Sequence, residues 1–104
     1  MKKITDDDFK EKVFEVGSKL IELFDVKNEQ YAKESDVLEA IKESADRRYG
    51  VVTKDTLSYV ILDYKDKHDL ALLKKGIKLG DTKERLLDII AYCILLYLVY
   101  ENDV

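Results

Sequence analysis

Carboxylate pairs at helical spacing are the residues of this sequence whose types and positions best suit chemistry. Three such pairs occur: Glu84 and Asp88, Asp63 and Asp66, and Glu39 and Glu43. Side chains three or four residues apart share one face of a helix, and carboxylate oxygens are the ligands that Mg²⁺ prefers. If either of the last two pairs meets the first between helices, the carboxylates form a metal cage. The alternative is an ordinary solvated surface, where such spacings are common.

A second group of residues suits a phosphate and a base. His68 is the only histidine, and it stands beside Lys67 and three residues after Lys65. A single histidine without a second His or Cys makes a poor zinc site, whereas cationic side chains together can contact phosphate. Tyr31 and Tyr92 can pack on a base or a sugar, although most tyrosines are core or interface residues. These five residues are the predicted ligand-binding set, with an ordinary boundary histidine as the alternative for His68.

Composition limits the partners. The chain has 104 residues, 18 of them basic and 22 acidic, with a net charge of -4. Double-stranded nucleic acid is an unsuitable partner, because its phosphates require a basic face. The single cysteine, Cys93, allows no disulfide framework and fits a reducing compartment. The N-terminal residues MKKITDDDF lack the apolar region of a secretory signal, so we expect a cytoplasmic protein.

Hydrophobic periodicity and helix-end signals predict four helices. Thr5 and the aspartates that follow it are typical of a helix start, and glycines stand where the second and third helices should end. The stretch 51–53 is short and β-branched, and we interpret it as a connector because a single strand has nothing to pair with. The predicted helices run from Asp6 to Asp25 or a little beyond, from a Ser35 cap to near Arg48, from Thr53 or Asp55 to about Lys75, and from Thr82 to Glu101.

The last of these helices decides the architecture. Every residue from Ile89 through Tyr100 is apolar or aromatic, so this helix has to be buried all round. The apolar stretch is too short for a membrane span, and Asp88 and Glu101 bracket it. A second copy of the chain is the natural source of the missing cover. We therefore expect a single all-α domain over residues 1–104, a four-helix up-and-down bundle that forms a dimer or tetramer through this helix.

Three short stretches also resemble a known family. They are Lys27-Asn28-Glu29-Gln30-Tyr31-Ala32 followed by Ser35-Asp36-Val37-Leu38, then Lys67-His68, then Glu84-Arg85-Leu86-Leu87-Asp88 with Tyr92. In this order, over about residues 20–101, they resemble small phage and prophage proteins related to the all-α nucleoside triphosphate pyrophosphohydrolases, the MazG-like group. Ala91 stands where the family pattern has Asn before Tyr92. The spacing from Glu84 to Asp88 is one residue longer than the family's E-x-x-D.

The resemblance implies a helical, oligomeric scaffold with a nucleotide site. Since the family's metal-binding pattern is incomplete, we expect a phage-type protein that binds a nucleotide without turning it over, for instance one that sequesters a signal of host defence in the host cytoplasm. The first alternative is a Mg²⁺-dependent pyrophosphohydrolase, with metal held by Asp63, Asp66, Glu84 and Asp88. The second is a protein-interaction module that inhibits a host enzyme, with an acidic surface that docks a basic partner.

Overall fold

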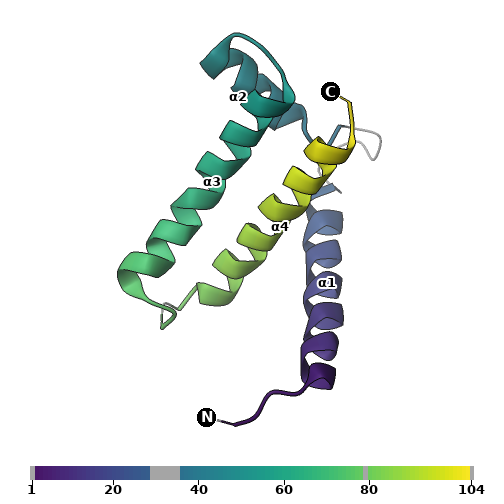
Figure 1. Ribbon diagram of the computed structural model, residues 1–104, viewed down its shortest axis with the longest axis vertical. Coiled ribbons are helices and arrows are strands. Elements are labelled where there is room, and N and C mark those ends of the chain that lie inside the picture. Colours follow the sequence, from purple (N-terminus) through teal and green to yellow (C-terminus); the bar gives the residue numbers. More distant parts are fainter. Residues whose placement is uncertain (1, 29–35, 79, 104) are drawn as a thin grey trace. The chain divides into compact units, whose positions relative to one another are not determined.

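The computed structural model describes residues 2–28, 36–78 and 80–103, and these residues contain four α-helices and no strand (Figure 1). The predicted all-helical fold is confirmed. The helices are α1 (Asp6–Asn28), α2 (Glu39–Tyr49), α3 (Lys54–Lys75) and α4 (Thr82–Glu101). They belong to two compact units, Met1–Ser35 with α1 and Asp36–Val104 with α2, α3 and α4. The expectation of a single domain over residues 1–104 stays a prediction.

Two helices begin with reciprocal hydrogen bonds between side chain and backbone. At α3 the Thr53 hydroxyl accepts from the Thr56 backbone N–H at 3.1 Å, and the Thr56 hydroxyl accepts from the Thr53 N–H at 2.9 Å. At α1 the Asp8 carboxylate accepts from the Thr5 N–H at 2.9 Å, and the Asp8 N–H donates to the Thr5 hydroxyl at 3.2 Å. Hydrogen bonding from Thr5 lowers the pKa of Asp8, with the bond from the Thr5 backbone N–H the largest cause. Both starts satisfy N–H groups that have no partner within the helix.

The second helix begins later than the sequence predicts. The predicted cap, Ser35, lies outside the described residues, and α2 starts only at Glu39. Asp36 stabilises a turn before α2. Its carboxylate accepts from the Leu38 N–H at 2.9 Å, and its carbonyl accepts from the Glu39 N–H at 3.0 Å. An aspartate that bonds the backbone two residues ahead stabilises a turn in place of a helix. Lys42, which donates to the same carboxylate, is the largest cause of the lowered pKa of Asp36.

Gly50 ends α2 in the left-handed region, with φ 74°, and leads into the connector 51–53. We expect Gly50→Ala to lower the free energy of unfolding by about 1–2 kcal/mol, because an L side chain is strained at positive φ. A Cβ at this position would meet no atom within 4 Å, so the loss would come from the backbone alone. Urea unfolding followed by circular dichroism measures the change.

Gly17 supplies the matched control for this substitution. It lies within α1, where a Cβ would also meet nothing within 4 Å, but its backbone is helical. Gly17→Ala should therefore raise the stability of that helix, by about 0.5–1 kcal/mol. Equal losses in the two variants would contradict the backbone explanation for Gly50.

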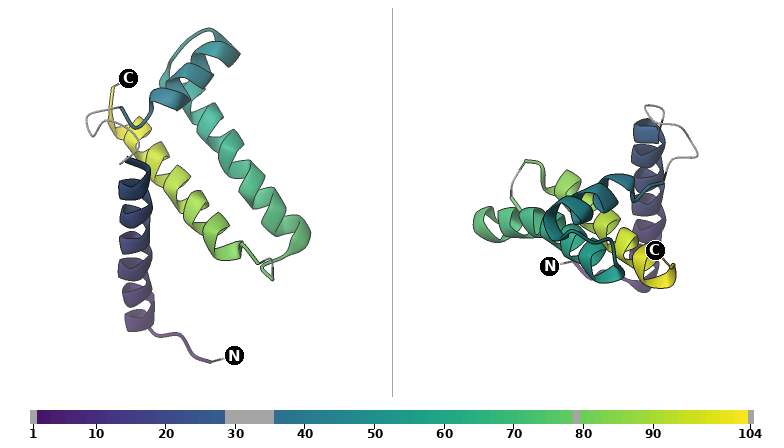
Figure 2. Two further views of the ribbon diagram at one scale, coloured as in Figure 1. Left: turned by 180° about the vertical axis from the view of Figure 1, so that it is seen from behind. Right: turned by 90° about the horizontal axis from the view of Figure 1, so that it is seen from above.

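The second unit is a helical hairpin with a short helix across one end. Helices α3 and α4 lie side by side and run in opposite directions, and α2 packs against α3 (Figures 1 and 2). The buried core lies where α3 begins and α4 ends, and Lys54 there donates to the Tyr100 carbonyl at 3.0 Å. Its apolar members are Leu38, Ile41, Ala45, Leu57, Val60, Ile61 and Val99.

Outside this core, α4 leaves much apolar surface in solvent. Val99 is its only fully buried residue, although its sequence is apolar nearly throughout. The exposed members between Leu86 and Leu98 span about 120° of the helix circumference at 100° per residue, over about 18 Å. Their exposed fractions run from 37% to 66%; they are Leu86, Ile90, Ile94, Tyr97 and Leu98. We call this surface the α4 apolar face.

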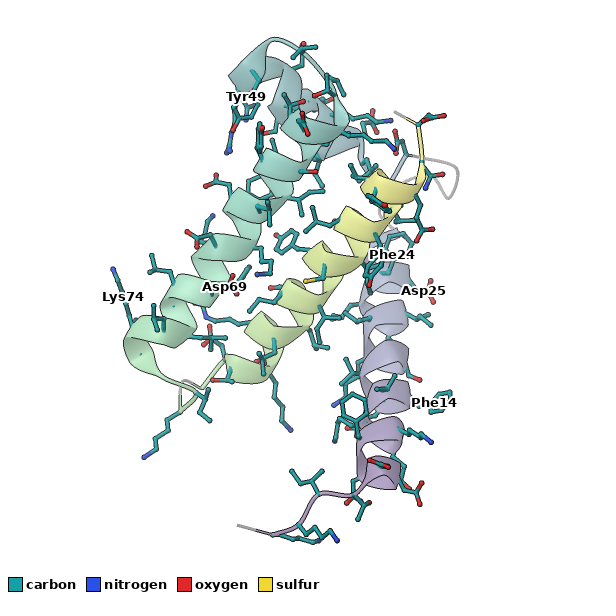
Figure 3. The ribbon with its side chains drawn as sticks, in the orientation of Figure 1. Phe14, Phe24, Asp25, Tyr49, Asp69 and Lys74 are labelled. Carbon is teal, nitrogen blue, oxygen red and sulfur yellow. The ribbon has the colours of Figure 1, made fainter. Side chains whose placement is uncertain are left out.

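Helix α1 also exposes apolar side chains. Phe9 is 68% exposed, Val13 55% and Phe24 47%, and Phe14 projects from the helix (Figure 3). Among the described residues, no helix combines the length and the apolar content that a membrane-spanning segment needs.

Candidate functional site

The half-buried polar residues of the hairpin gather where the middle of α3 faces the first half of α4. His68 of α3 lies at the centre, with its side chain 18% exposed. Its Nε2 lies 3.6 Å from Oδ2 of Asp88, and its Nδ1 lies 3.4 Å from Nη1 of Arg85. The ring of Tyr92 stacks against it, with centroids 5.9 Å apart and planes at 30°. We call His68, Asp81, Arg85, Asp88 and Tyr92 the His68 cluster.

The neighbours of His68 define its proton arrangement. A guanidinium has donors but no acceptor, so the contact with Arg85 requires Nδ1 to accept. The neutral ring then carries its proton on Nε2, which faces the Asp88 carboxylate. The two ring nitrogens therefore face different groups: Nδ1 faces a cation and Nε2 faces a carboxylate.

Arg85 is held in place with part of its bonding capacity unused. Its Nε lies 3.0 Å from Oδ2 of Asp81, one helical turn earlier, so the two charges attract each other. The angle is nevertheless unsuitable for a hydrogen bond: Arg85 Nε and Asp81 Oδ1 are both buried and have no hydrogen-bond partner among the described residues. A buried polar atom without a partner costs about 1–3 kcal/mol. This pair would gain from any group that completes its hydrogen bonds.

Tyr92 connects the cluster to the core. Its ring also lies 6.2 Å from that of Tyr64, tilted by 47°, and it packs against the buried apolar residues. Burial raises the pKa of Tyr92, and the charge of Asp88 raises it further. The phenol therefore stays protonated near neutral pH, where its hydroxyl can still donate a hydrogen bond.

The predicted lysines lie on the same helix as His68 but differ in their surroundings. Lys65 donates to the Asp69 carboxylate at 2.7 Å, and this bond is the largest cause of its raised pKa. Lys65 is half-buried, whereas Lys67 is exposed to solvent. Lys65 is thus held by an ion pair, and Lys67 remains a surface cation.

The predicted metal ligands have different contacts and do not form one cluster among the described residues. Asp88 faces His68, Glu84 is exposed in the first turn of α4, and Asp66 is exposed on α3. Asp63 pairs with Arg48 of α2, from Nη1 to Oδ2 at 2.9 Å. Within residues 2–28, 36–78 and 80–103, no group of three or more His, Cys, Asp or Glu side chains is arranged to hold a metal ion. The Mg²⁺ site stays a prediction.

The sequence predicts three members of the His68 cluster as site residues and does not predict the other two. His68, Asp88 and Tyr92 were predicted site residues, and the structure brings them together. Arg85 and Asp81 were not singled out, although their four-residue spacing on α4 is a signal for an ion pair. Tyr31, the remaining predicted ligand residue, lies outside the described residues.

Comparisons with known proteins add no identification. No family model matches the chain, and neither the curated proteins nor the solved structures contain a match.

Proposed function

We propose that this protein is a helical homo-oligomer that binds a nucleotide without hydrolysing it. In the proposal, the phosphates contact Arg85, Lys65, Lys67 and His68, and the tyrosines Tyr31 and Tyr92 contact the base or the sugar. Sequestration of a nucleotide signal of host defence by a phage-encoded, MazG-like protein is the biological role that fits this chemistry. The four-helix up-and-down arrangement and the oligomer are parts of the same proposal.

The observation that carries the proposal is the incomplete bonding of Arg85. A guanidinium presents its donors in a planar fork that matches phosphate oxygens, and charge-assisted bonds of this kind are strong. Arg85 Nε has a charged neighbour but no hydrogen-bond partner among the described residues. His68 lies directly beside the guanidinium, and a ring nitrogen that carries a proton can donate to a second phosphate oxygen. A phosphate that displaces Asp81 from the guanidinium would give the buried Nε a hydrogen-bond partner that it lacks among the described residues.

Binding without hydrolysis is supported by how the carboxylates are used. Asp63 is paired with Arg48, and Asp88 faces His68. Each would have to give up a partner before it could coordinate a metal that activates water. The second possibility from the sequence, a Mg²⁺-dependent pyrophosphohydrolase, requires that rearrangement.

The Asp81 carboxylate beside Arg85 provides a direct test of phosphate binding. A bound phosphate has to compete with the Asp81 carboxylate for the guanidinium, so Asp81→Asn should tighten nucleotide binding while Arg85→Gln weakens it. We expect changes of about tenfold in opposite directions, each equal to about 1.4 kcal/mol. The measurement is a thermal-shift titration with nucleoside triphosphates, cyclic nucleotides and ADP-ribose, each with and without Mg²⁺. For the parent protein, ligand at about 100 times its dissociation constant adds about 2.7 kcal/mol.

Lys83→Gln is the matched control, because Lys83 is an exposed cation in the same turn of α4. It should bind nucleotide within about twofold of the parent protein. Chromatography of the ligand afterwards separates sequestration, in which the nucleotide is recovered intact, from hydrolysis, in which Mg²⁺ releases pyrophosphate. If no nucleotide shifts the melting temperature, or if Asp81→Asn weakens binding as Arg85→Gln does, the proposal is wrong.

A further inference from the structure

The outer side of α3 forms a shallow hollow with apolar side chains toward the start of the helix and mainly acidic ones farther along. Its volume is about 490 Å³, and it is open to solvent. Tyr49 at the end of α2 contributes one wall; this residue and Asp69 are labelled in Figure 3. The other lining residues are Tyr59, Leu62, Asp63, Lys65, Asp66 and Asp69. We call this surface the α3 hollow.

Its apolar part consists of large side chains that solvent still reaches. Tyr49 and Tyr59 pack edge to face, with ring centroids 5.8 Å apart and planes at 66°. They are 46% and 52% exposed, and Leu62 is 48% exposed. Half-exposed tyrosines beside an aliphatic side chain are typical of surfaces that anchor a protein partner.

The charge of the hollow is negative and incompletely compensated. Asp63 and Asp69 are paired with Arg48 and Lys65 through one carboxylate oxygen each, Oδ2, at 2.9 and 2.7 Å. Asp66 is exposed and has no ion pair among the described residues, although its charge is one of the smaller causes of the raised pKa of Lys65. Each carboxylate of the hollow therefore keeps at least one oxygen that can accept from an incoming donor.

The chain itself contains an example of how a cation fits such a surface. The Arg48 guanidinium lies over the ring of Tyr64, 5.5 Å from its centroid, while its Nη1 bonds Asp63. Tyrosine and aspartate together thus hold an arginine within this fold by a cation–π contact and a charge-assisted hydrogen bond. On the exposed side of α3, Tyr59 and Asp66 lie about 10 Å apart along the helix, so they would receive two separate side chains of a partner.

The spacing along α3 specifies the shape of the partner. Tyr59, Leu62, Asp66 and Asp69 follow at steps of three, four and three residues, so they form one stripe along the helix. A helix laid along this stripe would place apolar side chains on Tyr59 and Leu62 and, farther along the same face, cationic ones at Asp66 and Asp69. Polyamines or metal ions would leave the apolar half of the hollow unused.

We infer that the α3 hollow docks a helix of a partner protein whose contacting face is apolar in one half and basic in the other. Lys65 lines the hollow and also belongs to the nucleotide proposal, but the residues that the test changes, Asp66 and Tyr59, take no part in that proposal. The inference gives the possible protein-interaction role a defined surface and a defined partner chemistry: arginine or lysine at helical spacing beside leucine-like side chains.

The probe is a fluorescein-labelled 18-residue helical peptide that carries leucine in one half of one face and arginine in the other half of that face. A second peptide, with glutamate in place of every arginine, is its counterpart. Fluorescence anisotropy with the full chain should show binding of the arginine peptide alone, weaker in high salt because exposed charges are screened. Asp66→Lys should weaken this binding by at least about tenfold, since like charges placed together in an interface are strongly unfavourable. Tyr59→Ala should also weaken it.

Glu11→Lys is the control for net charge, because Glu11 is exposed on α1, in the other unit. It makes the same charge change as Asp66→Lys and should leave the affinity within about twofold of the parent value. Unchanged circular dichroism and melting temperature show that the Asp66 variant is folded. The inference is overturned if the arginine peptide does not bind, if the glutamate peptide binds equally well, or if Glu11→Lys weakens binding as much as Asp66→Lys. Displacement of the peptide by spermine at equal charge would also overturn it.

Discussion

Leu57→Ala should cost about 2–5 kcal/mol of the free energy of unfolding, the range measured for large-to-small substitutions in packed cores. Leu57 is 0% exposed and lies at the point where the start of α3 meets its neighbours in the core. Removal of its isobutyl group leaves a cavity that Val60 and Ile61 on the same helix cannot fill without moving the backbone. Because small domains are stable by only about 5–15 kcal/mol, this single change threatens the whole second unit.

Urea unfolding of the variant measures this cost. Leu73→Ala is the matched control, since Leu73 is the same residue type on the same helix but is 82% exposed. It should change the stability by no more than about 0.5 kcal/mol. If the two variants lose similar amounts, the core assignment for Leu57 is wrong.

Ile94→Lys should convert an oligomer into monomers. Ile94 lies in the middle of the α4 apolar face and is 46% exposed in the single chain. Between Leu86 and Tyr100 the only charged residue is Asp88, which faces His68. An uncharged stripe of this length is typical of a helix that packs on a second copy, and a buried lysine without a partner there would cost several kcal/mol. The monomer should keep its helical content, because Ile94 is not a member of the core.

Analytical ultracentrifugation over a range of concentrations tests this expectation. Leu73→Lys, on an exposed part of α3, introduces the same charge away from the α4 apolar face and should leave the assembly intact. A parent protein that sediments as a monomer at all concentrations would contradict the proposed oligomer. So would an Ile94 variant with the assembly of the parent.

Much of the helical framework could be predicted, because it depends on local signals. The limits of α4 agree with the sequence, and α3 begins at the Thr53 cap and ends before Gly76 as expected. The sequence places the start of α2 too early. Asp36 can support either a turn or a helix, and its hydrogen bonds with Leu38 and Glu39 stabilise the turn. Hydrophobic periodicity also does not show how much of the α4 surface is buried within a single chain. The burial of α4 on all sides therefore stays a prediction about the oligomer.

The candidate site could be predicted only in part, because it depends on contacts between helices. His68 and Tyr92 are unusual residues at helical positions, and spacing alone made them candidates. Their stacking depends on how α3 and α4 are aligned along each other, and the sequence does not predict this alignment. Arg48 and Asp63 are 15 residues apart and meet across α2 and α3, so no short-range pattern reveals that Asp63 already has a cation.

The position of the core has a consequence for how the hairpin opens. Its fully buried residues gather where α3 begins and α4 ends, whereas the turn end is held by the half-buried polar contacts around His68 and Arg85. The free energy of local opening therefore rises along the hairpin from the turn to the core, since segments with few buried apolar contacts open first. Amide protons near the turn would exchange with solvent through small fluctuations, and those around Leu57 and Val99 only when the whole unit unfolds. The His68 cluster lies where the free energy of local opening is low, so its side chains can adjust around a ligand with little rearrangement of the core.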